Sequence, residues 1–152
     1  MHFAKLIVAF GIMAMLSVSA TLAAERGTPE EAKVLAEKGA AHLSAVGVEK
    51  AIADFNDPAS GYQDRDLFIF VYSAEGKILC APGVPALVGR DATALKDVNG
   101  KEFGKMIMAA AAGGSGWVDY QMSNPALKKT EPKRSYVVKA GDYVLGSGAY
   151  NP

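Results

Sequence analysis

The chain has 152 residues, with 16 basic residues balanced by 16 acidic ones and a single cysteine. This length suits one domain rather than two. Balanced charge without a basic cluster argues against a nucleic-acid partner, and the lone Cys80 excludes an internal disulfide framework. The fold must therefore be held together by its hydrophobic core.

Residues 1–24 have the pattern of a secretory signal peptide. A start that carries Lys5 precedes a mostly apolar run from Leu6 to Ala20, and small residues follow before Glu25. Because this run is shorter than the ~20 residues of a membrane-spanning helix, we expect cleavage, and a membrane anchor only if the leader stays uncleaved. Loss of the leader removes one lysine and no acid, leaving 15 basic and 16 acidic residues and a net charge of −1. The mature domain is expected to cover residues 25–152 and to work in the periplasm.

Two consecutive helices are predicted at the start of the mature chain. Thr28, Pro29 and Glu31 match an N-cap, a first-turn proline and a capping box. Gly47 ends the first helix, and a shorter second helix follows over residues 48–55. Small or apolar residues recur in the first helix at three- and four-residue spacing, which indicates a face that lies close to a flat partner such as a sheet: Ala32, Leu35, Ala36, Gly39, Ala40 and Leu43.

The middle of the chain predicts a hairpin, a long loop and a third helix. The apolar run LFIFVYS (67–73) indicates a central strand, and KILCA (77–81) its hairpin partner. Residues 82–100 are too long for an idle connection in a compact domain, and loops of this length are usually functional. Helical spacing resumes over residues 101–112, and Gly113 ends that helix.

Three strands are predicted after this helix. They cover residues 114–125, 133–140 and 142–150, and Pro125 separates the first from the second. Strands joined by short turns form an antiparallel sheet, and helices grouped apart from them indicate an α+β domain.

No constellation of catalytic residues can be recognised. His42 is the one histidine left once the leader is removed, and it lies in the first predicted helix, away from the strands. Cys80 is expected to be a small core residue, because a lone thiol in a strand usually is. Haem-attachment, paired-histidine and nucleophile-elbow motifs are missing from the sequence. We therefore predict no enzyme, no metal and no cofactor.

Aromatic residues gather on the predicted strands, which favours ligand binding. Tyr and Trp have an apolar body and a polar tip, so they suit an apolar pocket with a few orienting hydrogen bonds. On the strand at 114–125, Trp117 shares one face with Asp119, and Tyr120 shares the other with Val118. Alternation leaves open which of these faces meets the helices.

Lys133 precedes Tyr136 by three residues on the next strand. A cation beside a phenol favours a small carboxylate ligand through charge-assisted hydrogen bonds. The alternative is that Lys133 belongs to a solvated basic turn with Lys128, Lys129 and Arg134.

Three motifs together resemble those of single Cache domains, which are PAS-like sensor domains of bacterial periplasmic receptors. The first is Gly89-Arg90-Asp91 followed by KDVNGK (96–101), the second is GWVDY (116–120) followed by Asn124-Pro125, and the third is KRSY (133–136) followed by GSGAY (146–150). The resemblance covers nearly all of the mature chain.

The resemblance implies a PAS/Cache-like α+β fold, with a long N-terminal helix packed on one face of an antiparallel sheet. The other face and its loops would hold a small extracellular ligand, commonly an organic acid. Ala81-Pro82 stands where members often have His-Pro, so this pocket mouth lacks one imidazole donor. With Tyr72 from the aromatic cluster, the expected ligand-binding residues are Tyr72, Trp117, Tyr120, Lys133, Tyr136 and Gly146.

Receptors of this kind continue into a second membrane span and a signalling module, whereas this chain stops at Pro152. We therefore expect a free-standing periplasmic module that binds a small molecule and acts in signal transduction, such as chemotaxis, with a separate membrane sensor or transporter. The alternative is a structural or interaction protein with a vestigial pocket, which dimerises or binds its partner through the N-terminal helix. An enzyme is the third possibility, and it lacks the constellation just described.

Overall fold

The computed structural model describes residues 25–152, and the predicted leader lies outside the described residues. In chain order the helices and strands are α1 (Pro29–Val46), α2 (Val48–Asn56), β1 (Gln63–Asp64), β2 (Leu67–Phe68), β3 (Phe70–Ser73), β4 (Ile78–Cys80), α3 (Phe103–Ala112), β5 (Ser115–Asn124), β6 (Lys129–Ala140) and β7 (Tyr143–Tyr150). Within this part of the chain, no helix combines the length and the apolar character needed to cross a bilayer.

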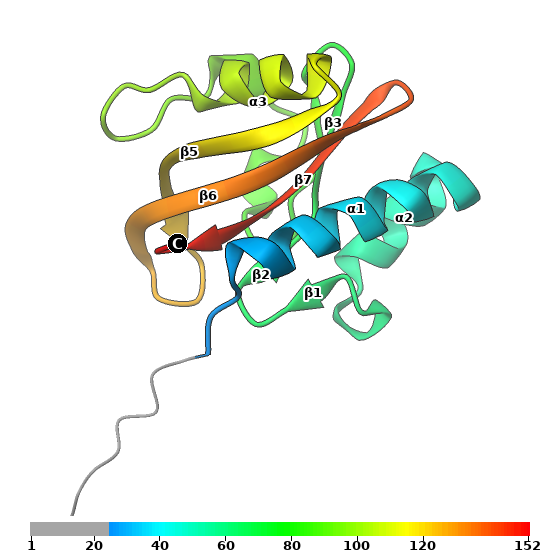
Figure 1. Cartoon of the computed structure of the whole chain (residues 1–152), viewed down its shortest axis with the longest axis horizontal. Coiled ribbons are helices and arrows are strands. Elements are labelled where there is room, and N and C mark those ends of the chain that lie inside the picture. The colour runs from blue at the N-terminus through cyan, green and yellow to red at the C-terminus, as the bar shows by residue number, and fades with distance from the viewer. Residues whose placement is uncertain (1–24) are drawn as a thin grey trace, which may run out of the picture.

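Five strands form one antiparallel sheet in the order β4-β3-β7-β6-β5, and β1 and β2 make a separate small hairpin. Helix α1 runs across one face of the sheet, with α2 beside it, and α3 lies on the other face (Figure 1). The predicted α+β architecture, with a long N-terminal helix on an antiparallel sheet, is confirmed.

The start and the packing of α1 follow from its sequence. Thr28 Oγ1 accepts a hydrogen bond from Glu31 N at 3.2 Å, and Glu31 Oε2 accepts one from Thr28 N at 2.8 Å, so the predicted capping box forms. Gly39 faces the sheet, where an added Cβ would lie 2.4 Å from Ile69 Cδ1. The missing side chain therefore allows α1 to approach the sheet closely.

The predicted central strand at 67–73 is divided in two. Residues 67–68 pair with β1, whereas residues 70–73 pair with both β4 and β7 in the main sheet. Strand β6 in turn begins at Lys129, four residues before the predicted start. Pro132 lies within this longer strand, and its carbonyl accepts from Asn151 N at 2.7 Å, just beyond the end of β7.

The long loop after β4 protects both edges of the sheet. At one edge Gly89 N donates to Ile78 O at 2.8 Å, and Ile78 N donates to Arg90 O at 2.9 Å. At the other edge Asp97 Oδ2 accepts from Gln121 N of β5 at 3.0 Å. Covered edges limit pairing with other chains, and the same contacts hold the loop over the sheet.

Candidate ligand-binding site

Alternation of side chains gives the sheet two faces. The helix face is covered by α1 and α2, and the loop face by α3 and the loop at residues 81–102. The β5–β6 register pairs Tyr120 with Lys133, and Trp117 with Tyr136. Tyr120 and Tyr72 belong to the hydrophobic cluster under α3. Because directly paired residues point to the same side, Lys133 is on the loop face, and Trp117 and Tyr136 are on the helix face.

Exposed Trp117 and half-buried Tyr136 form an aromatic pair on the helix face. Their ring centroids are 4.9 Å apart at 61°, and Lys33 of α1 places its Nζ 5.1 Å from the Tyr136 ring. The Tyr136 hydroxyl donates to Ser115 Oγ at 3.0 Å, and Trp117 is 41% exposed. The sequence interpretation put these two residues in one pocket with Tyr120 and Lys133. The structure separates the pairs, because neighbouring residues of a strand point to opposite faces.

Lys133 is a buried cation with one weak partner. It is 2% exposed, and its Nζ lies 4.3 Å from the Phe68 ring centre and 4.5 Å from that of Tyr150. It donates a long hydrogen bond, 3.4 Å, to the Tyr150 hydroxyl, and no carboxylate of residues 25–152 forms an ion pair with it. Burial lowers the pKa of Lys133 to about 7, while the negative charge of Asp66 acts in the opposite direction.

Buried phenols lie on the same face of the sheet as this lysine. The Tyr120 hydroxyl is 2.9 Å from Ser135 Oγ, and its ring stacks on Phe103 with centroids 4.4 Å apart and an interplanar angle of 2°. Burial raises the pKa of Tyr120 to about 12 and raises the pKa of Tyr72 further. The Tyr150 hydroxyl donates to Ser123 O at 3.0 Å. All three phenols are therefore neutral hydrogen-bonding groups at physiological pH.

Two glycines of β7 make room for the side chains on the loop face. A Cβ on Gly146 would lie 2.2 Å from Phe70 Cζ. A Cβ on Gly148 would lie 2.1 Å from Ser135 Oγ and 2.7 Å from Lys133 Cε. The predicted site residue Gly146 therefore seats an aromatic ring, and Gly148 leaves the space that the lysine stem crosses.

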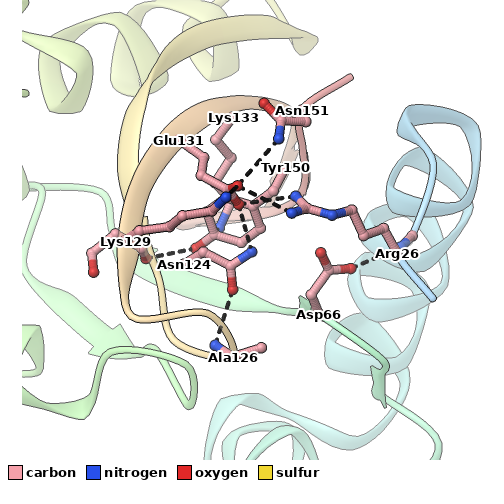
Figure 2. Close-up of polar contacts among 11 residues, drawn as sticks. Arg26, Asp66, Asn124, Ala126, Lys129, Glu131, Lys133, Tyr150 and Asn151 are labelled. Atoms are coloured by element: carbon pink, nitrogen blue, oxygen red, sulfur yellow. Dashed lines mark hydrogen bonds and ion pairs between the residues drawn. The ribbon is translucent and has the colours of Figure 1, made fainter. Parts of the chain in front are cut away.

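Glu131 lies two residues before Lys133 on the same face and is fully engaged by other residues (Figure 2). Arg26 binds both of its oxygens, at 2.9 and 3.0 Å. Lys129 at 3.0 Å, Asn124 at 2.9 Å and Asn151 at 3.2 Å complete the network. The hydrogen bonds from Arg26 lower the pKa of Glu131 to about 2, against the effect of burial. This carboxylate is thus already compensated and does not neutralise Lys133.

A cavity of about 420 Å³ borders the Glu131 network, and a smaller one of about 190 Å³ reaches Tyr120 and Lys133 at the β5 edge. The larger cavity lies within the size range of small-molecule sites. The Phe68 and Tyr150 rings both lie within 4.5 Å of the Lys133 ammonium. The residues lining the larger cavity are Glu25, Arg26, Arg65, Asp66, Asn124, Ala126 and Leu127.

The residues considered for catalysis lie apart from this site. His42 Nε2 is 2.8 Å from Asp54 Oδ2, between α1 and α2. The Cys80 thiol is buried on the helix face, and burial raises its pKa to about 11, so it is a poor nucleophile. Across residues 25–152, no group of three or more His, Cys, Asp and Glu side chains could hold a metal ion.

Of the six expected site residues, the structure brings Tyr72, Tyr120, Lys133 and Gly146 to the loop face. The six expected residues did not include Phe68 and Tyr150, which contact Lys133, or the Glu131 network. The sequence contains one pattern that could have indicated this site. At every second position of β6, on the same face as apolar Val137, the side chains of Glu131, Lys133 and Ser135 are polar. Polar residues at positions that alternate with a buried pattern indicate a site rather than solid core.

Comparison with known proteins places this architecture in a family. The family model for the Cache domain matches residues 53–151. A methyl-accepting chemotaxis protein from Vibrio parahaemolyticus RIMD 2210633 has a similar crystal structure, with a TM-score of 0.68 and 22% identity over 80% of this chain and 86% of that one. The periplasmic sensor domain of a chemotaxis protein has a TM-score of 0.63 and 26% sequence identity, over 81% of this chain and 90% of that one. A Cache chemosensory domain solved for carboxylic acid recognition has a TM-score of 0.60 and 20% sequence identity, over 81% of this chain and 88% of that one. No curated protein matches the chain in sequence. The matched residues make up well over half of the sequence, and the chain belongs to the Cache domain family.

Proposed function

We propose that this protein is an extracytoplasmic sensor module that binds a small carboxylate through the Lys133 ammonium. The observation that carries the proposal is that this ammonium is 2% exposed and has only a neutral phenol as its hydrogen-bond partner among the described residues. A buried charge without a counter-charge is costly. A carboxylate ligand would supply both the negative charge and the missing acceptors.

The surroundings of Lys133 support a ligand of this class. Tyr150 and the Tyr120–Ser135 pair offer neutral hydroxyls beside the ammonium, and the Phe68 ring supplies apolar contact. Among the similar structures, one Cache chemosensory domain was solved for carboxylic acid recognition, and another is a periplasmic sensor domain of a chemotaxis protein. A periplasmic location also agrees with the signal peptide predicted over residues 1–24.

We infer that the bound state is passed to a separate membrane sensor or transporter. Lys133 is two residues from Glu131, which connects Arg26, just before α1, with Asn151, just after β7. The Glu131 network therefore joins the two ends of the described chain beside Lys133 on β6. This arrangement supports a role in transmission, because a shift of β6 on ligand binding would reach both ends.

The proposal is tested by calorimetry and thermal shift with acetate, propionate, lactate and pyruvate. A ligand that binds only the folded state stabilises it by ~2.7 kcal/mol at a hundredfold excess over its Kd. We expect Lys133→Met to abolish the effect and Lys139→Met, an exposed lysine of the same strand, to retain it. Absence of binding by a folded sample free of co-purified ligand would refute the proposal.

A protein-interaction role is the second candidate, and exposed Trp117, which packs on Tyr136, favours it. Aromatic residues are enriched at protein interfaces. Capture of a periplasmic partner by the wild-type protein but not by Trp117→Ala, without any response to carboxylates, would favour this role over sensing.

A further inference from the structure

The turn between β1 and β2 carries backbone strain. Asp64 pairs with Leu67, so Arg65 and Asp66 alone connect the two strands. Arg65 has a φ of 55°, in the left-handed region where the Cβ of an L-residue is crowded. Two-residue hairpin turns usually place Asn, Asp or Gly at positions with positive φ. An arginine in this conformation therefore needs a compensating interaction.

The side chain of Arg65 supplies this compensation by binding the start of α1. Its guanidinium donates to the carbonyl of Arg26 at 2.9 Å and lies 2.8 Å from Glu31 Oε1. It also binds both oxygens of neighbouring Asp64, at 2.7 and 3.2 Å. Arg26 and Glu31 lie on either side of Thr28, the N-cap of α1. One strained residue of the β1–β2 turn thus holds the point at which the first helix begins.

Asp66, the other residue of the turn, binds the same segment and adds a second local cost. Its Oδ1 accepts a hydrogen bond from Gly27 N at 2.7 Å, whereas its Oδ2 is shielded from solvent and has no partner among residues 25–152. A buried acceptor without a donor costs free energy, and more so on a carboxylate. The contact that fixes Gly27 therefore keeps one carboxylate oxygen unsatisfied.

Gly27 fits against β2 because it has no side chain. It is buried, and an added Cβ would lie 2.2 Å from Leu67 Cγ. Next to it, Arg26 binds both oxygens of Glu131 on β6, at 2.9 and 3.0 Å (Figure 2). The segment before α1 is thus held by polar side chains of the β1–β2 turn and of β6, and by one close packing contact.

Side chains, and not a β-ladder, anchor the backbone of this segment. The three main-chain groups that hold it, Arg26 O, Gly27 N and Thr28 N, all bond to side chains. Strand β7, by contrast, is paired with β3 on one side and with β6 on the other. Segments outside the ladders open locally at a lower free energy than central strands. The segment before α1 is therefore suited to opening by itself.

We propose that residues 25–28, Arg65, Asp66 and Glu131 form a releasable clasp, in which the segment before α1 has a bound state and a released state while the sheet stays folded. Release relaxes the backbone of Arg65 and lets water reach Asp66 Oδ2. These two gains offset part of the contacts that are lost, which brings the two states close in free energy. The clasp is independent of any ligand at Lys133.

Release of the clasp changes access to the cavity of about 420 Å³. Arg26, Arg65 and Asp66 form one part of its lining, and the β5–β6 turn with Leu127 forms another. Departure of the segment before α1 removes part of this lining and uncovers Leu67, which is 2% exposed in the bound state. The clasp is thus a conformational device that opens one end of the domain.

Hydrogen exchange of the wild-type protein, followed residue by residue by NMR, tests for the released state. We expect the Gly27 amide to be protected, but at least about tenfold less than Leu145 of the central strand β7. In low concentrations of urea the exchange rate at Gly27 should stay nearly constant while that at Leu145 rises, because local release exposes little surface. Equal protection with the same urea dependence at both residues would overturn the proposal, and so would absence of protection at Gly27.

Two variants should shift the clasp to its released state by different means. Gly27→Ala keeps every charge and places a methyl group against Leu67. Arg65→Gly suits the positive φ and removes the guanidinium contacts. Each is expected to lower protection of the amide at position 27 by roughly 10–100-fold, while Leu145 stays at least about tenfold better protected than position 27.

Each variant has a matched control. Gly113→Ala adds a methyl group with only an ordinary contact, 3.5 Å from Ala110 O, and Arg134→Ala breaks an exposed arginine pair with Asp119. Both controls should leave protection at Gly27 within about threefold of wild type. Folded Gly27→Ala and Arg65→Gly proteins that also stay within threefold would overturn the proposal. Should a variant not fold, the urea dependence in the wild-type protein still decides.

Discussion

Lys133 and Tyr150 are directly opposed across β6 and β7, and the lysine Nζ lies 3.4 Å from the tyrosine hydroxyl and 4.5 Å from the centre of its ring. The phenol offers a lone pair and a ring face to the ammonium, but it brings no negative charge. The buried lysine is therefore held in place without being neutralised. Removal of this charge should therefore stabilise the ligand-free protein and weaken carboxylate binding.

Lys133→Met is expected to stabilise the ligand-free protein. Methionine keeps the apolar stem and removes the desolvated charge, and such replacements of buried charges by apolar residues are often stabilising by about 1–4 kcal/mol. Urea denaturation measures the change, and Lys139→Met should lie within about 0.5 kcal/mol of wild type. A clear loss of stability in Lys133→Met would show that the ammonium is well paired in the folded state.

Stability without ligand should rise with pH above neutrality. The pKa of Lys133 is about 7 in the folded protein against an ordinary value of 10.5. The unfolded chain therefore binds more protons between these two values, and the free energy of unfolding increases with pH by up to about 1.4 kcal/mol per unit. Denaturation at pH 7, 8 and 9 tests this slope, which should disappear in Lys133→Met.

Carboxylate affinity should change with pH in the opposite sense. Binding needs the charged ammonium, so affinity should fall by up to about tenfold per unit as the pH rises above 7. Calorimetry with the best carboxylate across the same pH range is the measurement. A constant affinity up to pH 9 would mean that the ligand does not contact Lys133.

Glu131 is expected to make the protein sensitive to acid. Its folded pKa of about 2 lies below the ordinary 4.5, so its contribution to stability is complete above pH 4.5 and is lost as the pH falls toward 2. Glu131→Gln should lower Tm by several degrees at pH 7 and by much less at pH 3. Glu37→Gln, which alters only an exposed pair with Lys33, serves as the control; an equal loss in both variants would rule out this role.

Gly148→Ala should destabilise the protein by about 1–3 kcal/mol through overpacking. The new methyl group would overlap Ser135 Oγ at 2.1 Å and crowd Lys133 Cε at 2.7 Å. Gly113→Ala is the control, because its Cβ would have only an ordinary contact, 3.5 Å, with Ala110 O. Comparable stability of the two variants would argue that the region beside Lys133 is loosely packed.

Trp117→Ala should leave ligand affinity within about twofold of wild type, since Trp117 is on the helix face. Tyr150→Phe should instead weaken binding by about three- to tenfold, the usual effect of losing one neutral hydrogen bond. The two variants are compared by calorimetry with the same carboxylate. The opposite order of effects would place the ligand on the helix face.

Local features of this protein could be predicted because their causes lie within a few residues of chain. The capping box of α1 involves Thr28 and Glu31, three residues apart, and it forms as expected. Spacing of three and four residues identified the buried face of α1, and period-two alternation identified the strands that make an antiparallel sheet. The division of the strand at 67–73 was missed, because its apolar residues suit a strand throughout and the β1 partner is only two residues long.

The site depended on contacts between residues far apart in the chain. Alternation shows that Trp117 and Tyr120 point to opposite faces, but only the tertiary structure determines which of those faces lies under α1 and which lies under α3. The pairing of Lys133 with Tyr150 follows from the β6–β7 register, and Arg26 reaches Glu131 across 105 residues of sequence. From sequence alone a lysine is expected at the surface, whereas in the folded protein Lys133 lies against Phe68 and Tyr150. The cost of a buried charge arises from this three-dimensional environment and not from the neighbouring residues in sequence.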